Sequence, residues 1–240
     1  MDRKYTIMDL HSHTYYSNCG RDNPRDLIET AIKHGVEVLG ISDHNYGIGE
    51  RKGDYLQEIR ALADEYKGKI KILCGIEIAT YPHLYDLKSP KEIDQYDYCL
   101  IEHITEEDSI VGGDLFEFCA QFSVPCGIAH TDLFLYCNQH GYEYEAFFKK
   151  MAQAGIFWEM NVNFDSIHRY NQHQYVKDFI SDEEKISLLR NAGVCISVGF
   201  DSHRHEEYDG FRVKKMTYLL KEKGLKTIEE DLALSKKINC

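Results

Sequence analysis

The chain has 240 residues, of which 43% are hydrophobic. This is enough to bury a core, so the composition excludes a disordered protein, and the length suits one α/β barrel. The 40 acidic and 28 basic residues give a formal net charge of −12, which argues against a protein that coats nucleic acid and predicts no stable nucleic-acid partner. No run approaches 18 apolar residues and the first ten residues lack an apolar signal core, so we expect no membrane association.

The eight cysteines do not form a CxxC pair, and most of them lie in apolar stretches. A chain of this length does not need disulfides to stabilise its fold. We therefore expect buried, reduced thiols and a cytoplasmic location.

Apolar runs typical of β-strands alternate along the chain with segments of helical periodicity. The expected strands cover residues 5–10, 36–42, 70–79, 98–101, 124–129, 156–162 and 194–199. The expected helices cover residues 24–34, 55–66, 115–121, 145–154 and 182–192. This alternation predicts βα units around a parallel sheet, an α/β fold.

Each of the seven expected strands ends in polar residues that can bind a metal or donate hydrogen bonds. The sequences at these ends are DLHSH at 9–13, SDH at 42–44, GIE at 75–77, EH at 102–103, HTD at 130–132, NVN at 161–163 and DSH at 201–203. In a closed parallel barrel the carboxyl ends of all strands share one face, where barrel enzymes place their active sites. The pattern therefore predicts one polar site built from every strand.

The residue types at this site suit metal ions. His11 and His13 are two residues apart and project to the same side, and Asp201 and His203 repeat that spacing. Imidazole and carboxylate groups suit zinc, manganese or iron. Six of the 12 histidines lie at strand ends, more than one tetrahedral ion requires, so we expect two to three divalent ions that activate water and stabilise a transferring phosphoryl group.

These motifs resemble those of the PHP (polymerase and histidinol phosphatase) metallophosphoesterases. The resemblance rests on DLHSHT at 9–14, SDH at 42–44, GIE at 75–77, His103, AH at 129–130 and FDSH at 200–203. It implies a distorted (β/α)7 TIM-like barrel, with residues 1–240 as a single PHP domain. It also implies three metal ions at the carboxyl ends of the strands.

The resemblance assigns the ligands of each ion. The first ion would be held by His11, His13, Glu77 and Asp201. Glu77 would bridge to a second ion held by His103 and His130, and a third would be held by His44, His203 and the residue six positions after His13. That residue is Cys19, where the family commonly has His or Asp. A thiolate there favours zinc or iron over magnesium; the alternative is that Cys19 turns away and the third site is weak or empty.

Several other residues are candidates for substrate contacts. Asn161 ends the sixth strand and can orient substrate or water, and His168 and Arg169 follow in the next loop. A guanidinium group can bind phosphate in a bidentate manner, so Arg169 and Arg204 are phosphate-binding candidates, although exposed arginines are usually only solvated. Asp9 and Asp43 can either accept the second ring N–H of a ligating histidine or make local loop hydrogen bonds.

Taken together, the motifs predict a metal-dependent phosphoesterase. We expect a metal-bound hydroxide to attack a small phosphate monoester, with histidinol phosphate as the leading candidate and Asp201 and His203 as candidate catalytic residues. The alternatives are a PHP-type phosphodiesterase or exonuclease, and a metal-binding module without catalysis. The sequence does not indicate an oligomeric state. We expect the remaining histidines to lie at a helix end, as for His34, or in solvated loops, as for His173.

Overall fold

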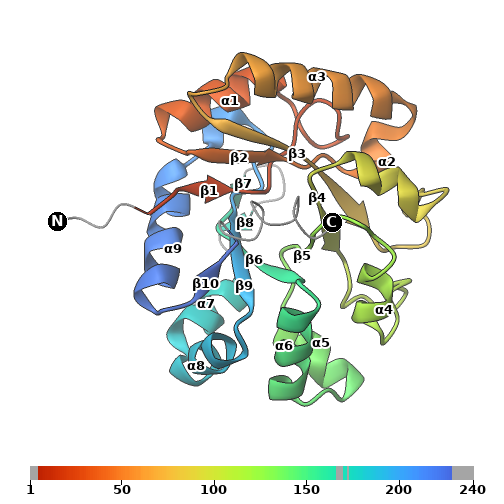
Figure 1. Cartoon of the computed structure of the whole chain (residues 1–240), viewed down its shortest axis with the longest axis vertical. Coiled ribbons are helices and arrows are strands. Elements are labelled where there is room, and N and C mark those ends of the chain that lie inside the picture. The colour runs from red at the N-terminus through yellow and green to blue at the C-terminus, as the bar shows by residue number, and fades with distance from the viewer. Residues whose placement is uncertain (1–4, 166–169, 172, 229–240) are drawn as a thin grey trace, which may run out of the picture.

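The structure, a computed structural model, describes residues 5–165, 170–171 and 173–228. Its main feature is a curled sheet of eight parallel strands surrounded by helices (Figure 1). The strands, in their order across the sheet, are β1 Met8–Asp9, β2 Val38–Ile41, β3 Lys71–Ala79, β4 Tyr98–Glu102, β5 Cys126–Ile128, β6 Phe157–Asn161, β9 Cys195–Gly199 and β10 Lys226–Thr227.

The helices cover the outside of this sheet (Figure 1). They are α1 Pro24–Lys33, α2 Asn45–Ile48, α3 Lys52–Glu65, α4 Leu115–Cys119, α5 Leu133–His140, α6 Tyr144–Gln153, α7 Gln174–Ser181, α8 Glu183–Ala192 and α9 Gly210–Glu222. Three 3₁₀ turns cover Gly49–Arg51, Pro90–Gln95 and His205–Glu207. Local sequence explains several of the helix ends: the Asn23 side chain accepts a hydrogen bond from the Arg25 N–H before α1, and α8 stops at Gly193 with φ of 75°.

The sheet closes because β1 lies between β2 and the end of β9. The backbone N–H of Leu10 donates to Val198 at 3.0 Å, and that of Asp201 donates to His11 at 2.7 Å. At its other end β9 pairs instead with β10, through Cys195 and Ile196. The prediction of a distorted TIM-like barrel is confirmed, but the sheet has eight strands where seven were expected, because the short β10 pairs with the start of β9 and β1 with its end.

Side chains alternate between the inside of the barrel and the helices. Along β4, Tyr98 and Leu100 belong to the inner cluster, whereas Cys99 and Ile101 pack against the helices. The inner cluster comprises Met8, Leu10, Val38, Leu73, Tyr98, Leu100, Ala129, Phe157, Cys195 and Ile228. Glycine makes room for the large rings, since a Cβ on Gly75 would lie 2.3 Å from the Tyr98 ring. The interior is therefore a packed apolar core, not a channel.

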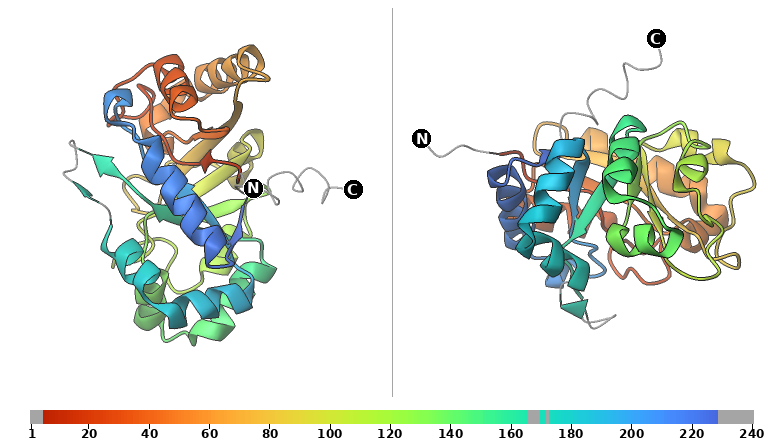
Figure 2. Two further views of the ribbon diagram at one scale, coloured as in Figure 1. Left: turned by 90° about the vertical axis from the view of Figure 1, so that its left-hand side faces the viewer. Right: turned by 90° about the horizontal axis from the view of Figure 1, so that it is seen from below.

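A short hairpin of β7 (Phe164–Asp165) and β8 (Tyr170–Asn171) follows β6 and projects from the carboxyl end of the barrel (Figure 2). Within the described ranges, no helix is both long and apolar enough to cross a membrane. The described cysteines are unbridged, and all of them except Cys19 are buried, as the sequence predicts. The cytoplasmic location and the extent of the single domain over residues 1–240 stay predictions.

Candidate metal centre

The carboxyl ends of the strands converge on a cavity of about 330 Å³. Seven of the nine predicted metal ligands line it: His13, His44, Glu77, His103, His130, Asp201 and His203. His11 lies fully buried beside them, with its Nε2 atom 3.2 Å from Glu77 Oε1. Six of the seven strands predicted to meet here thus contribute side chains to this cluster. No residue of the seventh, β6, lines the cavity, but its Glu159 contacts His11.

Four groups of side chains have ligand atoms that all lie within 4.8 Å of one another. These groups are His11–His13–Glu77, His11–His130–Asp201, His13–Cys19–His203 and His44–Glu77–Glu102. His103 is outside these groups, but its Nδ1 atom lies 3.3 Å from Glu102 Oε2. Glu102 was not among the predicted ligands.

Buried polar atoms without hydrogen-bond partners show that this donor set fits cations. In the described part of the chain these atoms include Nδ1 of His44 and His103, and Oε2 of Glu77. Leaving such groups unpaired away from water is costly, and ligation to a cation would satisfy them. Nitrogen and carboxylate oxygen atoms are the ligands that zinc, manganese and iron prefer.

The histidine and carboxylate groups of the cluster shift one another's pKa values. Burial lowers the pKa of His11 and of His44, but the nearby carboxylates, Glu159 for His11 and Glu77 for both, outweigh this effect and raise both pKa values well above the usual range. His130, beside Glu77, has its pKa raised to about 9. Burial raises the pKa of Glu77, yet the His11 and His44 rings hold it well below its usual value. These opposite shifts reflect how closely the rings and carboxylates are packed, an arrangement that would also hold divalent cations.

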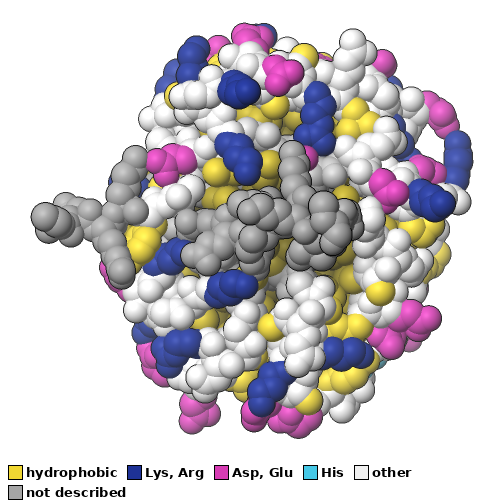
Figure 3. Space-filling view, viewed as in Figure 1, with side chains coloured by type: hydrophobic (Ala, Val, Ile, Leu, Met, Phe, Trp, Pro, Cys, Tyr) yellow, Lys and Arg dark blue, Asp and Glu magenta, His cyan; other side chains and the backbone are white. Residues whose placement is uncertain are grey.

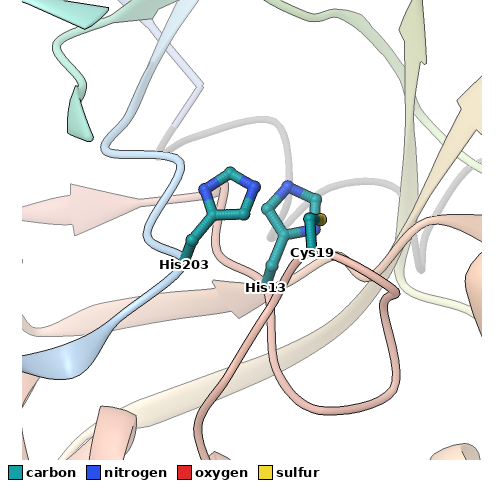
Figure 4. Close-up of side chains that lie close together, drawn as sticks. All are labelled: His13, Cys19 and His203. Carbon is teal, nitrogen blue, oxygen red and sulfur yellow. The ribbon is translucent and has the colours of Figure 1, made fainter. Parts of the chain in front are cut away.

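Cys19 lies beside three of the ligand histidines. Its side chain converges with those of His13 and His203 (Figure 4). Burial raises the pKa of the thiol, but hydrogen bonding to His203 and His44 more than compensates and leaves the pKa below its ordinary value. The resemblance grouped Cys19 with His44 and His203; the structure places His13 next to it as well.

The loop that carries Cys19 is held by Asp43. Its carboxylate accepts hydrogen bonds from the N–H groups of Thr14 and Ser17 and from both hydroxyls, at 2.6–3.0 Å. Asp9 likewise accepts from the backbone of His11 and Phe200 and from the Tyr208 hydroxyl. In the structure both aspartates make the loop hydrogen bonds, and neither contacts a histidine ring nitrogen through a hydrogen bond recorded among the described residues.

Glu159 is the carboxylate that orients a ligand histidine. Its Oε1 atom lies 2.8 Å from Nδ1 of His11, and its Oε2 atom accepts the backbone N–H of His130. This contact leaves Nε2 of His11 to face Glu77 and Asp201. Such outer partners fix the tautomer and ring orientation of a ligating histidine. Sequence reasoning missed Glu159, although it lies two residues after the inward-facing Phe157 on β6.

Asn161 is fully buried behind Asp201 and is not among the residues that line the cavity. Its side-chain nitrogen is 3.4 Å from both Asp201 Oδ2 and Glu159 Oε2, and its side-chain oxygen Oδ1 accepts the Asn163 N–H. The Asn163 amide also donates to Asp201, at 3.1 Å. These contacts position the Asp201 carboxylate; a substrate contact by Asn161 stays a prediction.

The other predicted substrate residues are not in the described cavity wall. Arg204 is partly exposed and does not line the cavity. His168 and Arg169 lie outside the described residues. His173, expected in a solvated loop, instead lines the cavity and stacks on His130 with ring centroids 5.8 Å apart. No local sequence signal distinguishes it from the other loop histidines.

Three residues at the strand ends have left-handed backbone conformations. The φ angles are 64° at His103, 24° at His130 and 57° at Asp201. Only glycine adopts this region without cost, and strained residues of other types cluster at functional sites. At each of these positions the chain turns sharply as it leaves the strand, which directs the side chain toward the cavity.

Comparison with known proteins agrees with this site. The model of the PHP domain matches residues 9–203. A histidinol-phosphatase from Lactococcus lactis is 32% identical over 95 residues, covering 37% of this chain and 34% of that protein. An uncharacterized protein from Methanocaldococcus jannaschii is 33% identical over 82 residues, covering 30% of this chain and 43% of the relative. The matches in sequence thus span about a third of the Lactococcus protein and about two fifths of the Methanocaldococcus protein.

Solved structures show the same fold over more of the chain. The histidinol phosphate phosphatase of Lactococcus lactis, complexed with zinc, L-histidinol and phosphate, has a TM-score of 0.65 at 20% identity and covers 92% of this chain and 95% of its own. The hisK protein of Listeria monocytogenes has a TM-score of 0.52 at 14% identity, covering 83% and 96%. The family model covers most of this chain, including every predicted metal ligand; the chain belongs to the PHP family.

Proposed function

We propose that this protein is a metal-dependent phosphatase that hydrolyses a small phosphate monoester. The observation that carries the proposal is the set of histidine and carboxylate groups around one cavity, with ligand atoms within 4.8 Å of one another. Membership of the PHP family and similarity to histidinol phosphatases support it.

The residues of the chain would hold two to three ions. His11, His13, Glu77, His130 and Asp201 form the buried part of the site, with His103 beside them. Cys19, with His13, His44 and His203 around it, would hold the third. Divalent cations supply an activated water and neutralise the charge of the phosphoryl group. The thiol makes zinc or iron the preferred occupant of the third site.

Other residues would orient these ligands or move a proton. Glu159 fixes the ring of His11, and the amides of Asn161 and Asn163 hold Asp201. Asp201 and His203 both line the cavity, and Nδ1 of His203 lies 2.9 Å from the Asp201 carbonyl oxygen. With Nδ1 held in this way, the other ring nitrogen of His203 would bind the third ion or, where that site is empty, protonate the leaving group; Asp201 is the second candidate acid.

The size and charge of the cavity favour a small substrate. A volume of about 330 Å³ is at the low end for small-molecule sites. Glu106 on its exposed wall would favour a leaving group that carries a positive charge, and histidinol phosphate is the leading candidate. On the face shown in Figure 3, basic side chains are interspersed with acidic and neutral ones, and the net charge of −12 argues against a nucleic-acid substrate.

The test combines metal analysis with a phosphate-release panel. Purified protein would be analysed by mass spectrometry for bound metals and then assayed with histidinol phosphate, nucleotides and sugar phosphates. We expect metal-dependent phosphate release that is highest for one small monoester. His130→Ala should abolish release, whereas His140→Ala, at the end of α5 and outside the cavity, should not.

Two results would overturn the proposal. Background release from every monoester with all metals bound would favour a metal-binding module. Faster cleavage of phosphodiesters or nucleic-acid ends than of any monoester would favour the phosphodiesterase or exonuclease alternative.

A further inference from the structure

Strand β4 directs a third side chain toward the barrel interior after Tyr98 and Leu100. Strand alternation places that side chain at Glu102, the last residue of β4. It is only 2% exposed, so its carboxylate has lost nearly all contact with water. The chain then turns at His103, which has a φ of 64°.

The two oxygens of Glu102 face different parts of the metal centre. Oε1 lies 3.1 Å from Nδ1 of His44. Oε2 lies 3.3 Å from Nδ1 of His103 and 3.7 Å from Nε2 of His130. The carboxylate therefore stands between the histidine of the predicted third ion and the two histidines of the predicted second ion.

These contacts leave Glu102 without a hydrogen-bond partner for Oε1. His44 Nδ1 lies close to two carboxylates, at 2.9 Å from Glu77 Oε2 and 3.1 Å from Glu102 Oε1, yet neither contact has hydrogen-bond direction. Glu102 is thus a buried carboxylate beside histidines of two predicted ions, with an unpaired oxygen that ligation to a cation would satisfy.

We infer that Glu102 is a further metal ligand, beyond the nine predicted from the strand-end motifs, and that its two oxygens link the second and third ions. The inference rests on the metal centre of the proposed function. It makes the site more acidic than the motif set alone, because Glu102 would add a buried carboxylate beside Glu77 and His44. The added negative charge strengthens binding of divalent cations.

The alternative is that Glu102 only stabilises a protonated His44 in the folded chain. In that case removal of the Glu102 charge would lower the stability of the metal-free protein and would not weaken its binding of metal. Loss of a metal ligand would weaken metal binding, whereas loss of a purely stabilising charge would lower only the stability of the metal-free protein.

The test replaces Glu102 by Gln, which keeps the shape and removes the charge. Glu106→Gln is the matched control, because Glu106 belongs to the same cavity wall but is exposed and is not within the ligand groups. Metal-free proteins would be titrated with zinc and with manganese against a chromophoric chelator, and bound ions per chain would be counted by mass spectrometry. Glu102→Asp, which keeps the charge but is one methylene shorter, serves if the Gln variant does not fold.

We expect Glu102→Gln to lose at least one ion per chain, or to bind it more than about 100-fold more weakly, a larger loss than outer partners of a metal site typically cause. Glu106→Gln should change the affinity only slightly, and Glu102→Asp should keep all ions but bind one of them more weakly. The increase in Tm on metal addition should also shrink for Glu102→Gln.

An unchanged metal count, affinity and metal-induced Tm shift in Glu102→Gln would overturn the inference and leave the proposed function intact. Failure of the unsubstituted protein to bind any metal would overturn both. Loss of metal binding in Glu102→Gln and Glu106→Gln alike would show that total charge, not ligation by Glu102, controls affinity, and would also overturn it.

Discussion

The two ends of the barrel interior differ sharply although the same strands build them. Near the middle, inward positions carry Leu73, Leu100 and Phe157. Four positions later on β3 and two positions later on β4 and β6, the same inward face carries Glu77, Glu102 and Glu159, each no more than 2% exposed. We call the apolar inner cluster the floor and these three buried glutamates the rim. Along each strand the rim lies only one or two inward-facing positions beyond the floor.

This difference shows how one scaffold separates stability from chemistry. The floor gains stability from burial of apolar side chains. The rim buries charges that are stable only when paired with protons, as in the raised pKa values of His11 and His44, or with cations. Changes at the two ends should consequently be read out by different measurements.

Metal removal should have the largest effect, and only at the rim. We expect dialysis against a strong chelator to reduce phosphate release to background, because the activated water and the charge neutralisation are lost. The floor should keep the chain folded, so circular dichroism should change little while Tm falls. Unfolding on chelation at 25 °C would contradict the separation of the two ends.

Phe157→Ala should destabilise the fold by disrupting the floor. The side chain is fully buried in the inner cluster, and its truncation should cost about 3–5 kcal/mol in the free energy of unfolding. Chemical denaturation would measure this loss. The number of metal ions bound per folded chain should remain unchanged; a parallel loss of metal would show that floor and rim are coupled.

Glu159→Gln changes the next inward-facing residue after Phe157 on β6 and should affect the rim. Loss of the carboxylate that holds His11 Nδ1 should weaken metal binding by about 10–100-fold, as expected for an outer partner of a ligand. Chelator competition would measure the affinity. Glu145→Gln, on the exposed face of α6, is the control and should have no effect.

The smallest expected effect concerns which metal is bound. Cys19→Ser should remove the third ion, and Cys19→Asp should restore it with a preference shifted from zinc toward manganese, since a carboxylate replaces a thiolate. Metal analysis after equilibration with equal zinc and manganese would show the ratio. Unchanged stoichiometry in Cys19→Ser would remove Cys19 from the ligands.

Much of the fold was predictable because the strand pattern is local. All seven expected strands are present, and Pro24 and Gly193 mark helix ends as their conformational preferences require. The short β10 strand and the β7–β8 hairpin were missed, because two-residue strands carry no periodicity.

The candidate site was predictable where residues lie at strand ends and less so elsewhere. Motif spacing identified His11, His13 and Glu77, which the structure brings together. Glu102 lies in the strand-end pair EH but was not assigned as a ligand. Glu159 was recognisable only by counting alternate residues from Phe157, which requires knowing which face is inward. His173 reaches the cavity through the path of a loop, and no spacing rule predicts that path.

The left-handed backbone at His103, His130 and Asp201 has a consequence for how this sequence can change. Each position would be more relaxed as glycine, so selection for thermal stability alone would replace all three and erase the centre. Their side chains persist only while the bound ions or the reaction favour them. If the activity became dispensable in some lineage, these three positions are where the family's ligands should decay first, and toward glycine or asparagine.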